Sequence, residues 1–151
     1  MFTITRRFPV NEAGQPRLDR TDVWKGLEQK ARDATRFVAR MQECVVIEDV
    51  GYELTRDIII RDEPHRERVT FTPEVEVVFE RIGGNTTGYI TNEIHEEDGE
   101  LVLQFSFNLE KEGLPDGSEA EKEYFGRVEA EYADAIATTL GTIRATKKNA
   151  A

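Results

Sequence analysis

Six strand-like segments follow one another between residues 43 and 112, and only short turns separate them. The turns contain Gly, Pro, Asn or Asp, as in the GGNT and EDG stretches, and such residues are typical of tight connections. Because short links join antiparallel neighbours, each strand is expected to lie beside the next. The predicted strands are residues 43–50, 52–62, 66–73, 75–82, 87–96 and 100–112.

The last of these segments contains the stretch LVLQFSFNLE, residues 101–110. Every second residue from Leu101 to Leu109 is Leu or Phe, whereas the residues between them are mostly polar. Side chains alternate across a strand, so this segment has one apolar face that must be covered. That face is either part of an ordinary core or the wall of a cavity that holds a ligand.

A long amphipathic helix is predicted from about residue 119 to about residue 147. Its apolar residues recur every three or four positions and mark one buried stripe. Ser118 and Glu121 have the spacing of a capping box at its start. At the other end of the chain, residues 2–10 are expected to form a strand and residues 33–41 a short helical piece. A short helix is expected between these two, with Thr21 as its N-cap.

The element order therefore predicts an α+β fold with one strand, two short helices, six strands and one long helix. A curved antiparallel sheet of seven strands would bend around the C-terminal helix, which covers its apolar face. The chain has 151 residues, a length that fits a single domain over residues 1–151. A sheet that bends around a single helix need not close fully, so a cavity can remain between them.

Composition narrows the class of partner. The formal net charge is −10, which argues against nucleic acid and against an anionic membrane surface as main partners. No run approaches 18 apolar residues and the N-terminus has no apolar signal segment, so stable membrane insertion is not expected and a cytoplasmic location is the default. Cys44 is expected to be a buried structural cysteine, because a catalytic thiolate needs a nearby histidine or cation.

Several segments resemble the AtaL-like family of the SRPBCC, or START-like, superfamily. They are DVWKGLEQKARDATRFVARMQECVVIED, LTRDIII, RERVTF and ITNEIHEEDGELVLQFSFNLE, and they include a W-x-G-L motif at residues 24–27. The resemblance extends over nearly the whole chain, from about Asp22 to the last helix. It implies a helix-grip fold with a pocket between the sheet and the long helix. It brings no catalytic motif to this chain, so it leaves the reaction open.

Two polar residues occupy positions that alternation directs inward. Arg56 lies in phase with Leu54 and Ile58, so it is a candidate to meet a carboxylate, phosphate or carbonyl group of a ligand. The alternatives are an internal salt bridge, or a β-bulge that turns the side chain outward. Asn92 lies in the same phase as its neighbours Ile90 and Ile94. Its amide must be satisfied by a ligand, by the backbone or by Arg56.

The leading hypothesis is a binding protein for a small hydrophobic molecule, such as a lipid, a polyketide-like compound or an aromatic metabolite. Arg56 and Asn92 would be its polar anchors. Tyr89 is a further lining candidate, although Ile90 beside it has the opposite phase. The other candidate lining residues are Trp24, Phe37, Phe79, Leu103, Phe105, Phe107, Tyr124, Val128 and Tyr132.

Two other functions stay open. The same pocket would suit an aromatase/cyclase-like or hydrolase-like enzyme of secondary metabolism, in which Arg56 stabilises an oxyanion and Asn92 positions it. A non-catalytic interaction module, such as a homodimer, is the third option. No cofactor motif is present, and His65 and His95 are not joined by enough convergent ligands to predict a metal site.

Overall fold

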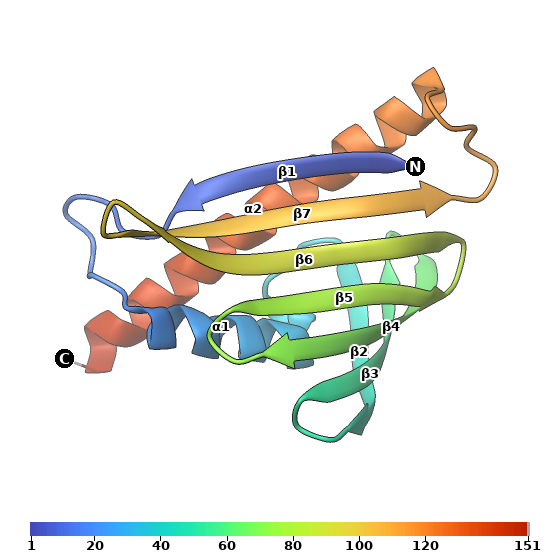
Figure 1. The fold of residues 1–151 in the computed structure, drawn as a ribbon. Helices are drawn as coiled ribbons and strands as arrows, with labels where there is room; N and C mark the ends of the chain where they lie inside the picture. Colours follow the sequence, from blue (N-terminus) through green and yellow to red (C-terminus); the bar gives the residue numbers. More distant parts are fainter. Residues whose placement is uncertain (151) are drawn as a thin grey trace.

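One antiparallel sheet of seven strands makes up most of the computed structural model, which describes residues 1–150 (Figure 1). Its strands are β1 (Phe2–Pro9), β2 (Met41–Asp49), β3 (Glu53–Ile60), β4 (Glu63–Thr72), β5 (Glu76–Gly83), β6 (Thr86–Glu97) and β7 (Glu100–Lys111). The helices are α1 (Arg20–Arg32), the 3-10 turn η1 (Ala34–Arg36) and α2 (Glu119–Ala150). The predicted α+β order, with the sheet and its long C-terminal helix, is confirmed.

The strand order β1-β7-β6-β5-β4-β3-β2 follows from the turns that the sequence carries. Each strand from β2 to β7 pairs antiparallel with the next strand along the chain, as the short connections predict. Only β1 makes a long-range pairing, with β7, where Phe2 lies opposite Leu109 and Phe8 opposite Leu103. β1 and β2 are therefore the two edges of the sheet.

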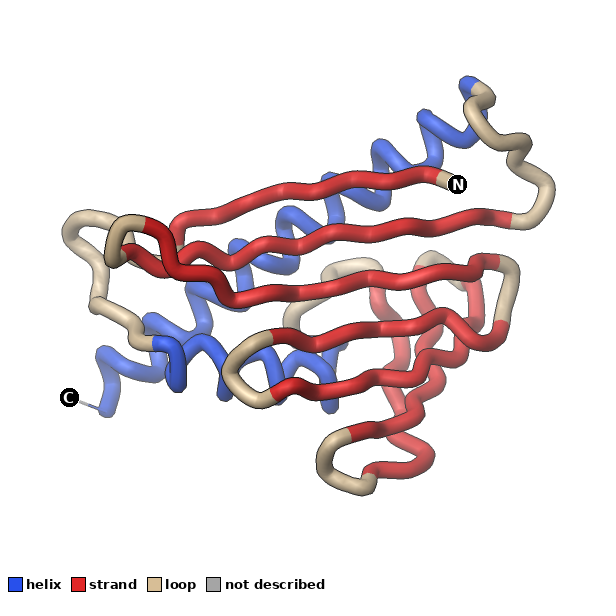
Figure 2. Tube along the Cα trace, in the orientation of Figure 1, coloured by secondary structure: helices blue, strands red, loops and turns tan. Residues whose placement is uncertain are grey.

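The apolar face of β7 lies against α2, which crosses one face of the sheet diagonally (Figures 1 and 2). Phe105, Phe107 and Phe125 are each at most 1% exposed, and the ring centroids of Phe107 and Phe125 are 6.0 Å apart. Tyr132 of α2 lies 6.1 Å from the Phe107 ring. At this end of the molecule, aromatic side chains fill the space between sheet and helix. The Leu/Phe face of β7 is therefore part of a packed core.

α1 packs against α2 at a close approach. Gly26 lies on the contact, and a Cβ at this position would be only 2.3 Å from Cδ1 of Ile143. The sequence indicated Thr21 as the N-cap of α1, but the N-cap is Asp19. Asp19 and Asp22 form a reciprocal capping box. The helical piece expected over residues 33–41 is shorter, since only η1 is helical there and β2 begins at Met41.

The start of α2 makes half of the predicted capping box. The backbone N–H of Glu121 donates to Oγ of Ser118 at 3.1 Å, but the Glu121 carboxylate accepts from the backbone of Gly117. α2 then extends to Ala150, a few residues beyond the predicted end. Among residues 1–150, no helix is both long enough and apolar enough to span a membrane.

Candidate functional site

A buried carboxylate lies between two arginines in the middle of the sheet. Arg56 on β3, Glu67 on β4 and Arg81 on β5 are cross-strand partners in register, so alternation directs all three side chains to the same inner face. One carboxylate oxygen of Glu67 accepts from Nε and Nη2 of Arg56 at 3.0 and 2.8 Å. The other accepts from Nε of Arg81 at 2.6 Å. All three residues are at most 6% exposed.

Both helices are bonded to this Arg56–Glu67–Arg81 triad. Nη1 of Arg56 donates to the carbonyl of Ala31 at 2.7 Å, so a cation lies at the C-terminus of α1, where the helix dipole favours it. Nη2 of Arg81 donates to the hydroxyl of Tyr132 on α2 at 3.0 Å. The predicted inward position of Arg56 is thus correct, and the side chain makes the internal salt bridge that was one of the two structural alternatives.

The triad holds Glu67 in its ionised form. Burial by itself would raise the pKa of this carboxyl. The charges and hydrogen bonds of Arg56 and Arg81 outweigh that effect and lower the pKa of Glu67 to about 2. Two guanidinium groups therefore share one negative charge in the interior.

Lys30 adds a third buried cationic group. It lies on the inner face of α1, it is 5% exposed, and its Nζ donates to Oδ1 of Asn92 at 3.0 Å. Among the described residues, no carboxylate lies within ion-pair distance of this amine. Burial, together with the nearby charge of Arg56, lowers the pKa of Lys30 to about 8, and the charge of Glu67 offsets only part of this. Lys30 is thus closer to neutral than an ordinary lysine.

A small cavity of about 10 Å³ lies where these groups meet. Its lining combines charged groups with apolar side chains of η1, the loop after it, β2, β5 and β6. The lining residues are Lys30, Ala34, Val38, Met41, Arg56, Glu67, Phe79, Ile90 and Tyr132. This volume fits about one water molecule, so at this point of the interior there is no open cavity of the size that a ligand would need.

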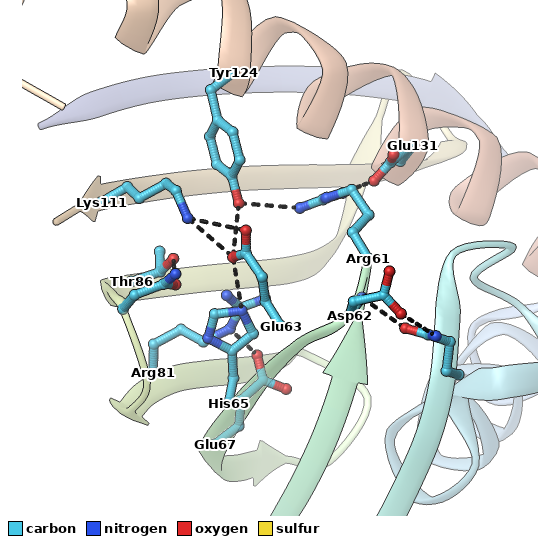
Figure 3. Close-up of polar contacts among 12 residues, drawn as sticks. Arg61, Asp62, Glu63, His65, Glu67, Arg81, Thr86, Lys111, Tyr124 and Glu131 are labelled. Carbon is cyan, nitrogen blue, oxygen red and sulfur yellow. Dashed lines mark hydrogen bonds and ion pairs between the residues drawn. The ribbon is translucent and has the colours of Figure 1, made fainter. Parts of the chain in front are cut away.

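A second polar cluster lies next to the triad, toward the ends of β4 and β7 (Figure 3). Nζ of Lys111 donates to both oxygens of Glu63 at 3.0 and 3.1 Å, and the hydroxyl of Tyr124 donates to the same carboxylate at 3.4 Å. Nη2 of Arg61 donates to the Tyr124 hydroxyl at 3.4 Å. This cluster is half-exposed at Glu63, so it joins the buried triad to the surface.

His65 lies between the two clusters and is only 3% exposed. Neither of its ring nitrogens has a hydrogen-bond partner among the described residues. Burial, followed by the charge of Arg81, lowers the pKa of His65 to about 4. The imidazole is therefore neutral near pH 7.

The structure separates the predicted lining residues into two groups. Arg56, Phe79 and Tyr132 border the small cavity, and Asn92 reaches it through Lys30. The others lie elsewhere, and one candidate is wrong: Tyr89 is 50% exposed on the outer face of β6. Leu103, Phe105, Phe107 and Val128 are packed in the core, Trp24 lies edge-on against Phe71, Phe37 is buried after η1, and Tyr124 belongs to the second cluster.

Sequence reasoning missed Lys30, Glu67 and Arg81 as site residues. Each had a detectable signal, because each lies in the inward phase of its element: Glu67 two residues before Val69, and Arg81 two residues after Phe79. Lys30 follows the buried Leu27 by three residues on α1.

Cys44 is half-buried, with Nη1 of Arg56 3.7 Å from its sulfur. Among residues 1–150, no three His, Cys, Asp or Glu side chains lie close enough together to hold a metal ion.

Comparison with known proteins agrees with this architecture. Residues 4–150 match the model of one family, AtaL, described as acetylaranotin biosynthesis cluster protein L. The chain belongs to the AtaL family. No curated protein matches the AtaL chain significantly in sequence.

Solved structures show the same helix-grip fold at low identity. The di-domain aromatase/cyclase StfQ of the steffimycin pathway is 16% identical, with a TM-score of 0.71 over 99% of the AtaL chain. The AtaL chain spans about half of that protein, 52% of its length. The ZhuI aromatase/cyclase of Streptomyces sp. R1128 is 15% identical, with a TM-score of 0.70, over 94% of this chain and 93% of its own. A START superfamily protein of Mycobacterium smegmatis is 11% identical, with a TM-score of 0.66, over 93% and 98%.

Proposed function

We propose that this AtaL protein binds a small, largely apolar organic molecule between the sheet and α2, and anchors one polar group of it at Lys30 and Asn92. The observation that carries this proposal is the excess of positive charge around the cavity. Lys30 and Arg56 line it, and Glu67 is the one carboxylate among its lining residues. Glu67 is already shared by Arg56 and by Arg81, which lies behind the cavity wall. A ligand oxygen with negative charge or free lone pairs would offset that excess, which is costly in a buried site.

The ligand must make its own room. Small-molecule sites usually have volumes of about 300–1,000 Å³, whereas the cavity here has about 10 Å³. Three apolar residues of its lining, Ala34, Val38 and Met41, belong to a small hydrophobic cluster that is separate from the main core, whereas Phe79 and Ile90 belong to the main core. Movement of η1 and the start of β2 would therefore enlarge the cavity without disturbing the Phe105–Phe107 core.

Two comparisons support a metabolite as the ligand. The description of the family refers to a biosynthesis cluster, and two similar folds, StfQ and ZhuI, are aromatase/cyclases. An enzyme that uses Arg56 to stabilise an oxyanion receives less support. All three nitrogens of Arg56 already donate, to Glu67 and to carbonyls of α1.

A titration with 8-anilinonaphthalene-1-sulfonate, an aromatic anionic probe, tests the proposal. Met41→Trp fills the cavity side of β2 and should weaken probe binding at least ten-fold, whereas Tyr89→Trp, on the outer face, should leave it unchanged. Unlabelled aromatic acids should displace the probe from the wild type. Thermal unfolding of both variants checks that the fold persists, because overpacking can cost about 1–3 kcal/mol. Absence of saturable binding to the folded wild type would refute the proposal.

A further inference from the structure

Lys30 differs from every other strongly buried cation of the described chain in its partner. Arg56 and Arg81 each donate to the Glu67 carboxylate, whereas Nζ of Lys30 has only the neutral amide oxygen of Asn92, at 3.0 Å. Lys111 is the informative comparison. Its side chain is 14% exposed, yet its Nζ is ion-paired with Glu63 at 3.0 Å. A buried ammonium that lacks a counter-ion is poorly stabilised in its charged form.

The surroundings of Lys30 favour an amine with a free lone pair. Lys30 lines the small cavity, and Arg56 lines the same cavity, so a second cationic group lies close to the amine. Desolvation and a neighbouring cation both disfavour the ammonium, and they are the two means by which proteins activate lysine as a nucleophile. The pKa of Lys30, lowered to about 8, agrees with this arrangement.

We propose that Lys30 is a reactive amine that condenses with an aldehyde or ketone group of the bound molecule to form an imine. Nζ attacks the carbonyl carbon, and the π electrons of the C=O bond move to the oxygen. That oxygen leaves as water with the two hydrogens of the amine, and a C=N bond remains. The hydrogen bond to Asn92 orients the amine.

This proposal rests on the proposed function, because the carbonyl compound must enter the same interior. It also narrows the ligand class to apolar molecules with an aldehyde or ketone. Around pH 7 about a tenth of an amine with a pKa of about 8 is neutral, roughly 200-fold more than for an ordinary lysine. Burial slows access and reduces this advantage, so we expect an excess reactivity of at least ten-fold.

Reductive trapping in the folded protein tests the imine. The wild type is incubated at pH 7 with propanal or benzaldehyde and sodium cyanoborohydride, and peptide mass spectrometry measures the alkylation rate of each lysine. Lys30 should react at least ten-fold faster than Lys111 and the exposed Lys25. Its rate should level off above about pH 8. Alkylation of Lys30 no faster than of Lys111 would overturn the proposal, and a urea-unfolded sample shows that both peptides are detected.

Two variants serve as controls. Lys30→Met replaces the lysine with an apolar side chain of similar length and should abolish the trapped adduct at this position. Lys25→Met should leave the rate at Lys30 unchanged.

Probe binding separates the two proposals. If the naphthalene sulfonate binds the wild type and Lys30 is not alkylated, the imine proposal alone is wrong. If neither the probe nor the aldehydes reach the interior, both are wrong.

Discussion

Glu67 is the residue on which the buried charges depend. Glu67→Gln removes the negative charge and leaves Arg56 and Arg81 in the interior without a counter-ion. Breaking a buried pair in this way typically costs about 3–5 kcal/mol. We expect urea unfolding at pH 7 to show a loss of this size in the free energy of unfolding.

The control is Glu80→Gln on the outer face of β5. Glu80 is paired with Arg68 at 3.2 Å, but both side chains are at least one-third exposed, so this change should cost less than about 1 kcal/mol. Equal losses in the two variants would mean that the buried triad does not stabilise the fold more than a surface pair.

The sequence predicted the direction of Arg56 but not its partner. Alternation with Leu54 and Ile58 was enough to place the side chain inward. Its pairing with Glu67 and Arg81 depends on the register of three strands, which no local pattern reveals. The contact between Lys30 and Asn92 was hidden for the same reason, since 62 positions of sequence separate the two residues.

At the scale of elements, the contact between α1 and α2 is controlled by Gly26. Gly26→Ala improves helix propensity by about 1 kcal/mol, but the new methyl group would lie 2.3 Å from Cδ1 of Ile143. We therefore expect Gly26→Ala to be neutral or destabilising in the wild type. In an Ile143→Ala background, where the clash is gone, the same change should stabilise by up to about 1 kcal/mol.

Chemical unfolding of the two single variants and the double variant measures this coupling. If the effects of Gly26→Ala and Ile143→Ala on the free energy of unfolding were additive, the helices could move apart without loss of stability. Gly26 would then not set their spacing.

The elements themselves were largely predictable, and the errors lie at their ends. In the stretch LDRTD, both Asp19 and Thr21 can cap a helix. Asp19 does so because Asp22 lies three residues later and completes the box. In addition, Leu18 and Val23, on either side of the cap, are both buried and fit a hydrophobic staple. The capping propensities of Asp19 and Thr21 do not distinguish the two candidates. The box and the packing of the flanking residues do, and a propensity for one position does not include them.

At the scale of the whole molecule, the sequence predicted a sheet wrapped around a helix but left the space between them open. Phe105, Phe107, Phe125 and Tyr132 largely settle that question by their size, because their rings lie 6.0–6.4 Å apart and fill the β7 end of the interior. The remaining gap depends on how far α1 and η1 approach the sheet. That distance is set by long-range contacts, so the volume of about 10 Å³ was not predictable.

The stability of the whole molecule should fall between pH 7 and pH 5, mainly because of His65. The groups that influence this imidazole are Arg81, Glu67, Glu63 and Lys111, and burial together with Arg81 lowers its pKa to about 4. In the unfolded chain the pKa returns to about 6.5, so between these values the unfolded state binds more protons than the folded state. Acidification in this window therefore favours unfolding, by about 2 kcal/mol between pH 7 and pH 5.

His65→Phe tests this origin, because phenylalanine has a similar size and no titratable group. Urea unfolding measures the free energy of unfolding at pH 7 and at pH 5. Between these values the wild type should lose about 2 kcal/mol, and His65→Phe should lose much less. The control His95→Gln, at an exposed site, should lose as much as the wild type. Glu67 does not interfere, because a carboxyl whose pKa is lowered to about 2 loses its contribution only as the pH falls from about 4.5 toward 2. An unchanged pH dependence in His65→Phe would assign the acid sensitivity to another group.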